Sequence, residues 1–343
     1  MCAYPTRCLG RRFLQSGLAA VLFLVLATAP TARAQTTIIW GGTSGSWNLG
    51  ANWNGGVQPG TPDTAQITTG NASVDSNVSI AALLLSGGGI SGLANLTLTG
   101  AGSTWSAGDM NSAGTTTIAS GGTLAISTAA NHDFNTRALV NQGTVNWTGG
   151  LLRSGNGGSI TNNATWNDAA SSTVNNPFGG AFTFTNASGA TYNKTAAGTT
   201  LFQNSVGFNN SGAVNVTAGT LELNGGGTAA ATGVFNTSAG ALTLFSNNYT
   251  LASGAALTGA GTYQVSGGTL DIAGTLAGTN LTQTGGVLAG TQTFGTGSVF
   301  NWTAGDWNTA GTTTIASGGT LAISTAANHD FNTRALVNNG TVN

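Results

Sequence analysis

Apolar residues in this chain recur in pairs separated by a single residue, within a motif close to Gly-Thr-Leu-x-Ile. Successive residues of a strand face opposite sides, so each pair predicts a short strand with one buried face. Glu222 and Asp271 stand inside such pairs, where the same geometry directs them to water. The pairs are Leu96/Leu98, Leu124/Ile126, Leu221/Leu223, Leu242/Leu244, Leu270/Ile272 and Leu321/Ile323.

A second motif, close to Asn-x-Gly-x-Val, gives the length of the repeat. It is centred on Gly143, Ala164, Gly189 and Gly212, at intervals of 21, 25 and 23 residues. Short strands joined by glycine and asparagine turns at this spacing predict an all-β, right-handed parallel β-helix of roughly 20–25 residues per coil and roughly twelve coils. Asparagine tolerates left-handed backbone at turns, and we expect the asparagines to bond along the stack. An array of β-sandwiches would instead need hairpins and units of about 100 residues.

A 42-residue segment occurs twice. Residues 105–146 (cassette 1) return as residues 302–343 (cassette 2) with four changes, at 106/303, 110/307, 112/309 and 142/339. A solenoid grows when a unit is copied, because each coil touches mainly its neighbours. Cassette 2 stops at Asn343, where cassette 1 continues into Trp147. We therefore expect the repeat array, residues 75–343, to be part of a longer one.

Residues 1–34 have the pattern of a signal peptide. Basic residues precede an apolar run at 18–29, and Ala32 to Ala34 form a small-x-small cleavage site. We therefore expect an exported protein, extracellular or on the outer cell surface, that starts at Gln35. Cys2 and Cys8 both lie before this point, so the mature chain has no thiol for a disulfide or a metal.

Residues 35–74 are rich in tryptophan and glycine. Trp40, Trp47 and Trp53 fall within fourteen residues. One interpretation is a carbohydrate-stacking site, in which open ring faces contact sugars. We favour a second one, an N-terminal cap over the first coil, because solenoids need an atypical terminal unit to cover their exposed edge.

Charge excludes two classes of partner. The chain has 5% charged residues, and after residue 34 four basic side chains stand against nine acidic ones. Nucleic acids and anionic membranes are bound through clusters of lysine and arginine. We therefore expect neither as a partner.

The segment WGGTSGSWNLGANWNGGVQPGTPDTAQI, followed by SGGTL and NxGTV coils, resembles bacterial autotransporter-type and haemagglutinin-like surface proteins with autotransporter-associated β-strand repeats. The resemblance covers nearly the whole chain after residue 34. It implies a right-handed β-helix passenger, displayed at or released from the cell surface and often used for adhesion.

The residues most similar to a catalytic cluster occur in both cassettes: His132, Asp133 and Arg137, and their copies His329, Asp330 and Arg334. A histidine beside a carboxylate and an arginine suits acid–base chemistry on a sugar uronate. Asp109 precedes Asp133 by about one coil, a spacing that would allow these carboxylates to stack, and the same holds for Asp306 and Asp330. Adjacent residues of a strand face opposite sides, however, and we favour a polar loop with Phe134 turned inward.

Other chemistry has weaker support. The calcium-binding Gly-Gly-x-Gly-x-Asp repeat and the phosphate-binding Gly-Lys-Ser/Thr motif are both missing. We expect no cofactor and no metal. Threonine clusters at 115–117 and 312–314 suggest an ice-binding face, which would need outward threonines on most coils.

The sequence thus favours a structural or adhesive surface protein rather than an enzyme, with a cell surface, a glycan or a matrix as its partner. The repeated cassette suggests multivalent binding. The alternative is a β-helix polysaccharide lyase or glycoside hydrolase, which would need clustered carboxylates in a cleft.

Overall fold

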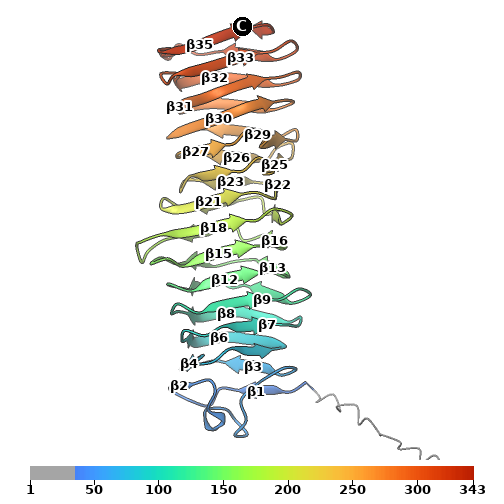
Figure 1. Ribbon diagram of the computed structural model, residues 1–343, viewed down its shortest axis with the longest axis vertical. Helices are drawn as coiled ribbons and strands as arrows, with labels where there is room; N and C mark the ends of the chain where they lie inside the picture. The colour runs from blue at the N-terminus through green and yellow to red at the C-terminus, as the bar shows by residue number, and fades with distance from the viewer. Residues whose placement is uncertain (1–34) are drawn as a thin grey trace, which may run out of the picture. The chain divides into compact units, whose positions relative to one another are not determined.

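The computed structural model describes residues 35–343, which form a stack of parallel β-coils (Figure 1). The stack has about 13 turns of about 21 residues, which confirms the predicted parallel β-helix. The expected signal peptide lies outside the described residues. Within them the one helix is the 3-10 turn η1 (Gly50–Asn52), and no helix is long and apolar enough to cross a membrane.

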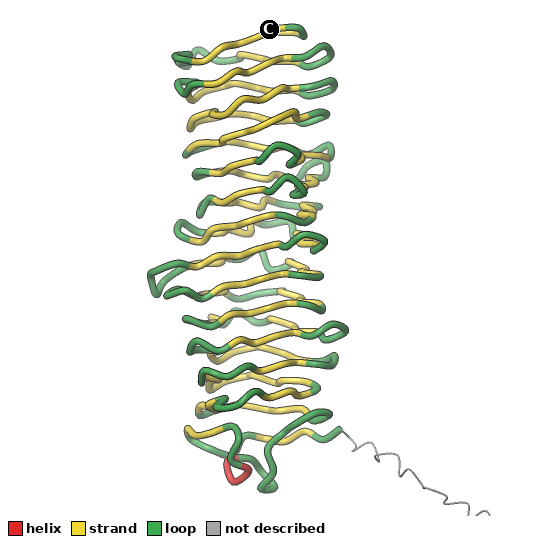
Figure 2. Tube along the Cα trace, in the orientation of Figure 1, coloured by secondary structure: helices red, strands yellow, loops and turns green. Residues whose placement is uncertain are grey.

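Each central coil gives one strand to each of three faces, and corners between the strands are loops (Figure 2). A strand pairs in parallel with the third strand after it along the chain, as β9 with β12 and β10 with β13. Face 1 consists of β5 (Val78–Ile80), β7 (Leu96–Leu98), β9 (Thr115–Ile118), β12 (Ala138–Asn141), β15 (Ser159–Asn162), β18 (Phe182–Asn186), β21 (Val206–Asn210), β24 (Gly227–Ala229) and β27 (Tyr249–Leu251).

Faces 2 and 3 complete the coils. Face 2 consists of β1 (Thr37–Ile39), β3 (Thr64–Ile67), β6 (Ala82–Ser91), β8 (Ser103–Met110), β10 (Thr123–Ile126), β13 (Thr144–Trp147), β16 (Thr165–Asp168), β19 (Thr191–Lys194), β22 (Ala213–Val216), β25 (Val234–Thr237) and β28 (Ala256–Thr258). Face 3 consists of β2 (Ser44–Ser46), β4 (Asn71–Ser73), the ends of β6 and β8, β11 (Asn131–Asp133), β14 (Leu151–Arg153), β17 (Thr173–Asn175), β20 (Thr199–Phe202), β23 (Thr220–Leu223), β26 (Leu242–Phe245) and β29 (Thr262–Val265). The last coils contain β30 (Thr269–Leu276), β31 (Asn280–Phe294), β32 (Val299–Asp306), β33 (Gly311–Ile315), β34 (Thr320–Ile323), β35 (Arg334–Asn338) and β36 (Thr341–Val342).

The alternation of apolar and polar residues sets the core. In β23, Leu221 and Leu223 are buried, while Glu222 lies on the outer side and accepts a hydrogen bond from Ser246. This confirms the predicted register. The same register keeps a carboxylate out of the core, where an unpaired charge would cost several kcal/mol, on the order of 5.

The prediction for Leu242 and Leu244 is wrong. In β26 these leucines lie on the outer side, and Thr243 and Phe245 point inward. The ring of Phe245 packs against Phe235 and Tyr249, with centroid distances of 5.9 and 4.9 Å. The Phe245 ring completes an aromatic cluster in the core with Phe235 and Tyr249, and this packing determines the register.

Asparagines form a ladder inside the stack. The Nδ2 atoms of Asn141, Asn162 and Asn186 donate to the Oδ1 atom of the next asparagine, ending at Asn210, over 2.7, 2.8 and 2.9 Å. Bonding along the stack is thus confirmed, although these asparagines end strands rather than form turns. Left-handed backbone is rare among them: of the described asparagines, Asn156 alone has positive φ.

The three N-terminal tryptophans pack against one another. Trp53 lies between Trp40 and Trp47, at centroid distances of 4.9 and 4.7 Å, and its Nε1 donates to the Trp47 carbonyl. All three side chains are buried. Buried rings are closed to sugars, so the tryptophans do not offer the carbohydrate-stacking site considered above.

Candidate functional site

His132 lies inside the coil. The segment 131–137, expected to bulge as a polar loop, instead begins as strand β11, and the alternation turns His132 inward. Its ring meets Trp105 edge-on at 5.0 Å, and its Nε2 lies 3.0 Å from the Trp105 carbonyl oxygen. Burial lowers the pKa of the histidine, which favours the neutral ring that donates to this carbonyl. A ring in this position is closed to a substrate.

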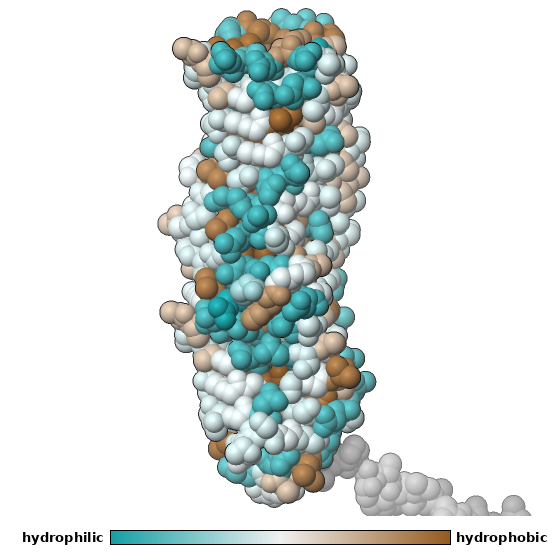
Figure 3. All heavy atoms as spheres, turned by 90° about the vertical axis from the view of Figure 1, so that its left-hand side faces the viewer, coloured by the Kyte–Doolittle hydropathy of each residue, from teal (hydrophilic) through white to brown (hydrophobic). Residues whose placement is uncertain are grey.

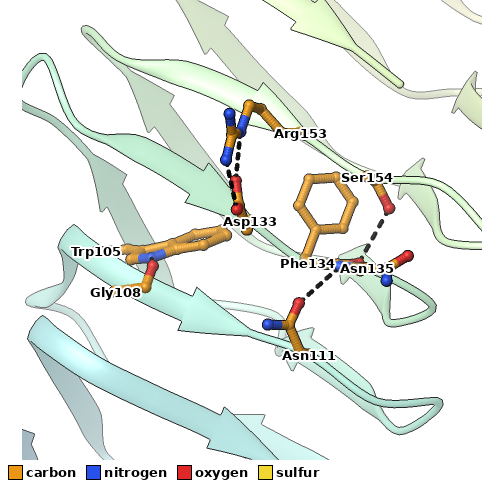
Figure 4. A network of polar contacts seen from close by, with 8 residues as sticks. All are labelled: Trp105, Gly108, Asn111, Asp133, Phe134, Asn135, Arg153 and Ser154. Carbon is orange, nitrogen blue, oxygen red and sulfur yellow. Dashed lines mark hydrogen bonds and ion pairs between the residues drawn. The ribbon is translucent and has the colours of Figure 1, made fainter. Parts of the chain in front are cut away.

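Phe134 is turned inward, as expected. Its ring contacts Phe182 at 5.4 Å, and the Ser154 hydroxyl on the next coil donates to its carbonyl oxygen over 3.0 Å (Figure 4). On the other side, the backbone N–H of Asn135 donates to Oδ1 of Asn111. Side chains of both neighbouring coils therefore fix the segment after β11.

Asp133 faces outward and binds an arginine that the sequence analysis did not single out. Arg153 is its register partner in β14, and the guanidinium donates to both carboxylate oxygens, with N–O distances of 2.6 and 2.7 Å (Figure 4). The Arg153 guanidinium also lies 5.9 Å from the centre of the Phe178 ring. The interval between the two residues, one coil, was the signal that could have found this pair.

Asp109 lies near the same pair. Burial, and then the charge of Asp133, raise the pKa of Asp109, while the charge of Arg153 lowers it. Asp109 therefore lies near enough to Asp133 and Arg153 for both charges to act on it. These three residues form a small charged group on face 3.

Arg137 joins three successive coils. Its Nε donates to the Thr116 hydroxyl over 2.8 Å, and its terminal nitrogens donate to the carbonyls of Thr115 and Gly92, over 3.2 and 3.4 Å. The side chain is buried, and burial lowers its pKa to about 10. Arg137 thus uses its hydrogen-bond donors inside the stack rather than on a ligand.

Cassette 2 repeats most of this arrangement. The His329 Nε2 lies 3.0 Å from the Trp302 carbonyl oxygen, and the buried Arg334 donates to Thr313, Gln292 and the Gly290 carbonyl. Asp330 is exposed and has no ion-pair partner among residues 35–343.

The two cassettes lie on different faces. Strand pairing that starts at β12 in cassette 1 follows face 1 through β27, β30 and β31 to the Trp307–Phe331 bridge. It does not reach β35, the counterpart of β12, which pairs with β33. The cassettes are 197 residues apart, which is not a whole number of coils. Corresponding side chains of the two cassettes therefore lie on different, adjacent faces of the stack. The cassettes are not placed to bind one flat surface together.

The threonine clusters have a structural explanation. In each cluster the middle residue, Thr116 or Thr313, points inward and accepts the Nε–H of the cassette arginine. The middle residue of each cluster is therefore part of the core, and the threonines on either side of it lie on the outer side of the strand.

The candidate residues do not meet in one site. His132 and Arg137 point into the stack and Asp133 points out. No pocket opens in the described part of the chain, and no three of its His, Cys, Asp and Glu side chains gather as metal ligands. Comparison of the chain with family models, with curated proteins and with solved structures finds no match.

Proposed function

We propose that this protein is an exported structural and adhesive rod that binds a cell surface, a glycan or a matrix through its extended outer faces. Its most reactive side chains support the rod itself: His132 and Arg137 each donate hydrogen bonds to backbone carbonyls of neighbouring coils. The outer surface instead presents side chains in columns, because parallel pairing places residues of successive coils above one another.

The observation that carries this proposal is the regular spacing of polar groups on the outer surface. Strands of successive coils pair in parallel along most of each face, so outward groups repeat at the strand spacing, about 4.8 Å. A rigid array of this kind loses little conformational entropy when it binds, because its side chains are already ordered. Many weak contacts on one rigid rod then add to a strong attachment.

The alternative function, a polysaccharide lyase or hydrolase, has one specific observation in its favour. Asp109 lies within reach of the charges of Asp133 and its partner Arg153, and the raised pKa of Asp109 suits a general acid. This charged group is therefore the place where a β-helix enzyme of this sequence would act on an anionic glycan.

A paired assay separates the two functions. Beads coated with the protein are tested for attachment to cells and to immobilised polysaccharides, and the free protein is incubated with pectin and alginate. We expect attachment and no chain cleavage. Cleavage that disappears in an Asp109→Asn/Asp133→Asn variant, but persists in a Glu222→Gln control on the same face, would establish the enzyme instead.

A further inference from the structure

We propose that face 2, from β13 to β25, is the binding face of the rod and that its ligand is a neutral, hydroxyl-rich polysaccharide. This inference rests on the proposed adhesive function and names its surface and its partner. The inference is argued from two parallel columns of outward side chains. One column consists of asparagines, and the first three members of the other are threonines.

The asparagine column is continuous over five strands and internally bonded. Each Nδ2 donates to the Oδ1 of the preceding coil, with N–O distances of 2.8, 3.0, 3.0 and 3.3 Å. These bonds hold the amides in one orientation. An amide has two N–H groups and two acceptor positions, so each ladder amide keeps at least one donor and one acceptor for a ligand. The members are Asn146, Asn167, Asn193, Asn215 and Asn236.

The threonine column runs beside the amides, two residues earlier in each strand. Thr144, Thr165 and Thr191 are register partners, and their hydroxyls have no hydrogen-bond partner within residues 35–343. A strand rises about 3.3 Å per residue, so the columns lie about 7 Å apart, and both repeat at about 4.8 Å along the axis. Over β13, β16 and β19 the face therefore presents a two-dimensional grid of donors and acceptors, and in β22 and β25 the second column continues as Ala213 and Val234.

The chemistry of the grid identifies the class of partner. No outward side chain of β13, β16, β19, β22 or β25 is ionisable, whereas face 3 carries Asp133, Arg153 and Glu222. An anionic glycan or a nucleic acid would find no outward cation on these strands, because Lys194 of β19 points inward. Protein partners are held mainly by aromatic and arginine anchors, which these outward positions also lack.

A neutral polysaccharide fits both the charge and the repeat. Its hydroxyl groups donate and accept at regular intervals along the polymer, as the amides and threonines do along the rod. A single exposed hydrogen bond gains little over water, so affinity must come from many contacts made together. Pre-oriented amides lower the cost of each contact.

Matched lysine variants test the face. Thr165→Lys/Thr191→Lys places two long cationic side chains in the threonine column of β16 and β19. Thr161→Lys/Thr185→Lys places the same charges at register partners of the adjacent strands β15 and β18, on face 1. All four threonines are half-buried and point outward, so the pairs differ mainly in the face they occupy. A denaturation curve for each variant verifies that it folds.

Binding is measured by depletion of the protein onto insoluble cellulose, mannan, galactan and starch, with immobilised alginate for comparison. We expect retention by a neutral polymer, a loss of at least about tenfold in the face 2 variant, and little change in the face 1 variant. Equal loss in both variants, loss in the face 1 variant alone, or retention by alginate alone would overturn the assignment. The assignment would also be overturned if none of the neutral polymers retained the unmodified protein and this protein inhibited ice recrystallisation. Attachment to cells that survives in the face 2 variant would leave the adhesive function standing and remove this inference.

Discussion

The two cassettes share 38 of 42 residues and have different surroundings. In cassette 1, the next coil covers Phe134, Leu139 and Val145, which are 1%, 2% and 0% exposed. Their counterparts in the last coils, Phe331, Leu336 and Val342, are 46%, 37% and 37% exposed. Apolar side chains gather at this end of the rod (Figure 3). The sequence of a coil thus determines which side chains turn inward, and the adjacent coil determines how far they are buried.

The largest expected difference concerns the phenylalanines. Phe134→Ala removes a ring packed between Trp105 and Phe182 and leaves a cavity, which should lower the free energy of unfolding by about 3–5 kcal/mol. Phe331→Ala should cost about 1 kcal/mol or less, because almost half of that side chain already faces water. Urea unfolding, combined with hydrogen exchange to separate local from global opening, measures both. Equal costs would mean that the neighbouring coil does not decide burial.

The stability costs of removing Arg137 and Arg334 should differ less, because both side chains are buried. Arg137→Ala removes a donor from the Thr116 hydroxyl and from two carbonyls, at an expected cost of about 2–4 kcal/mol. Arg334→Ala should cost nearly as much, since Thr313, Gln292 and Gly290 lose the same guanidinium. The Arg137→Lys control keeps the charge and loses the planar fork, so it should recover only part of the stability. Full recovery by lysine would show that charge, not the fork of donors, holds the coils.

Much of this fold follows from the sequence because a solenoid repeats one simple rule. Apolar residues at every second position, in motifs that recur every 20–25 residues, are enough to predict parallel coils. The alternation also predicts that His132 and Asp133 point to opposite sides. The rule fails at β26, where both Leu242 and Phe245 are apolar and packing against Phe235 decides between them. A short apolar pattern does not show which of its alternating residues point inward when both sets include an apolar side chain.

Contacts between coils were harder to predict than the coils. Asp133 meets Arg153, and Arg137 meets Thr116, because each pair is separated by about one coil. Coil length varies, however: Tyr263 pairs with Leu281, 18 residues on, whereas Thr123 pairs with Thr144, 21 residues on. This variation accumulates along the chain, so the rotation of cassette 2 by one face was not visible in the repeat.

Acidification should act on cassette 1 through His132. The pKa of this histidine is lowered by burial, so the unfolded chain takes up the proton more readily than the folded one. Stability from the neutral ring is therefore complete above the pKa of the unfolded histidine, about 6.5, and falls as the pH decreases below it. Hydrogen exchange of β11 amides at about pH 7 and about pH 5 measures the effect. A His132→Gln variant should remove this component of the pH dependence, and a variant that keeps it unchanged would assign the effect to other groups.

The smallest expected effect distinguishes Asp133 from Asp330. Asp133→Asn breaks a bidentate pair with Arg153 whose two side chains remain partly exposed, and such pairs contribute about 0.5–1 kcal/mol. Asp330→Asn removes an exposed carboxylate without an ion-pair partner in the described part of the chain, so its effect should be close to zero. The difference should shrink in concentrated salt, which screens an exposed pair more than a buried one. A salt series of urea midpoints for the two variants tests this point. A difference that persists unchanged at high salt would mean that Asp133 acts through hydrogen bonds and packing against the next coil rather than through its charge.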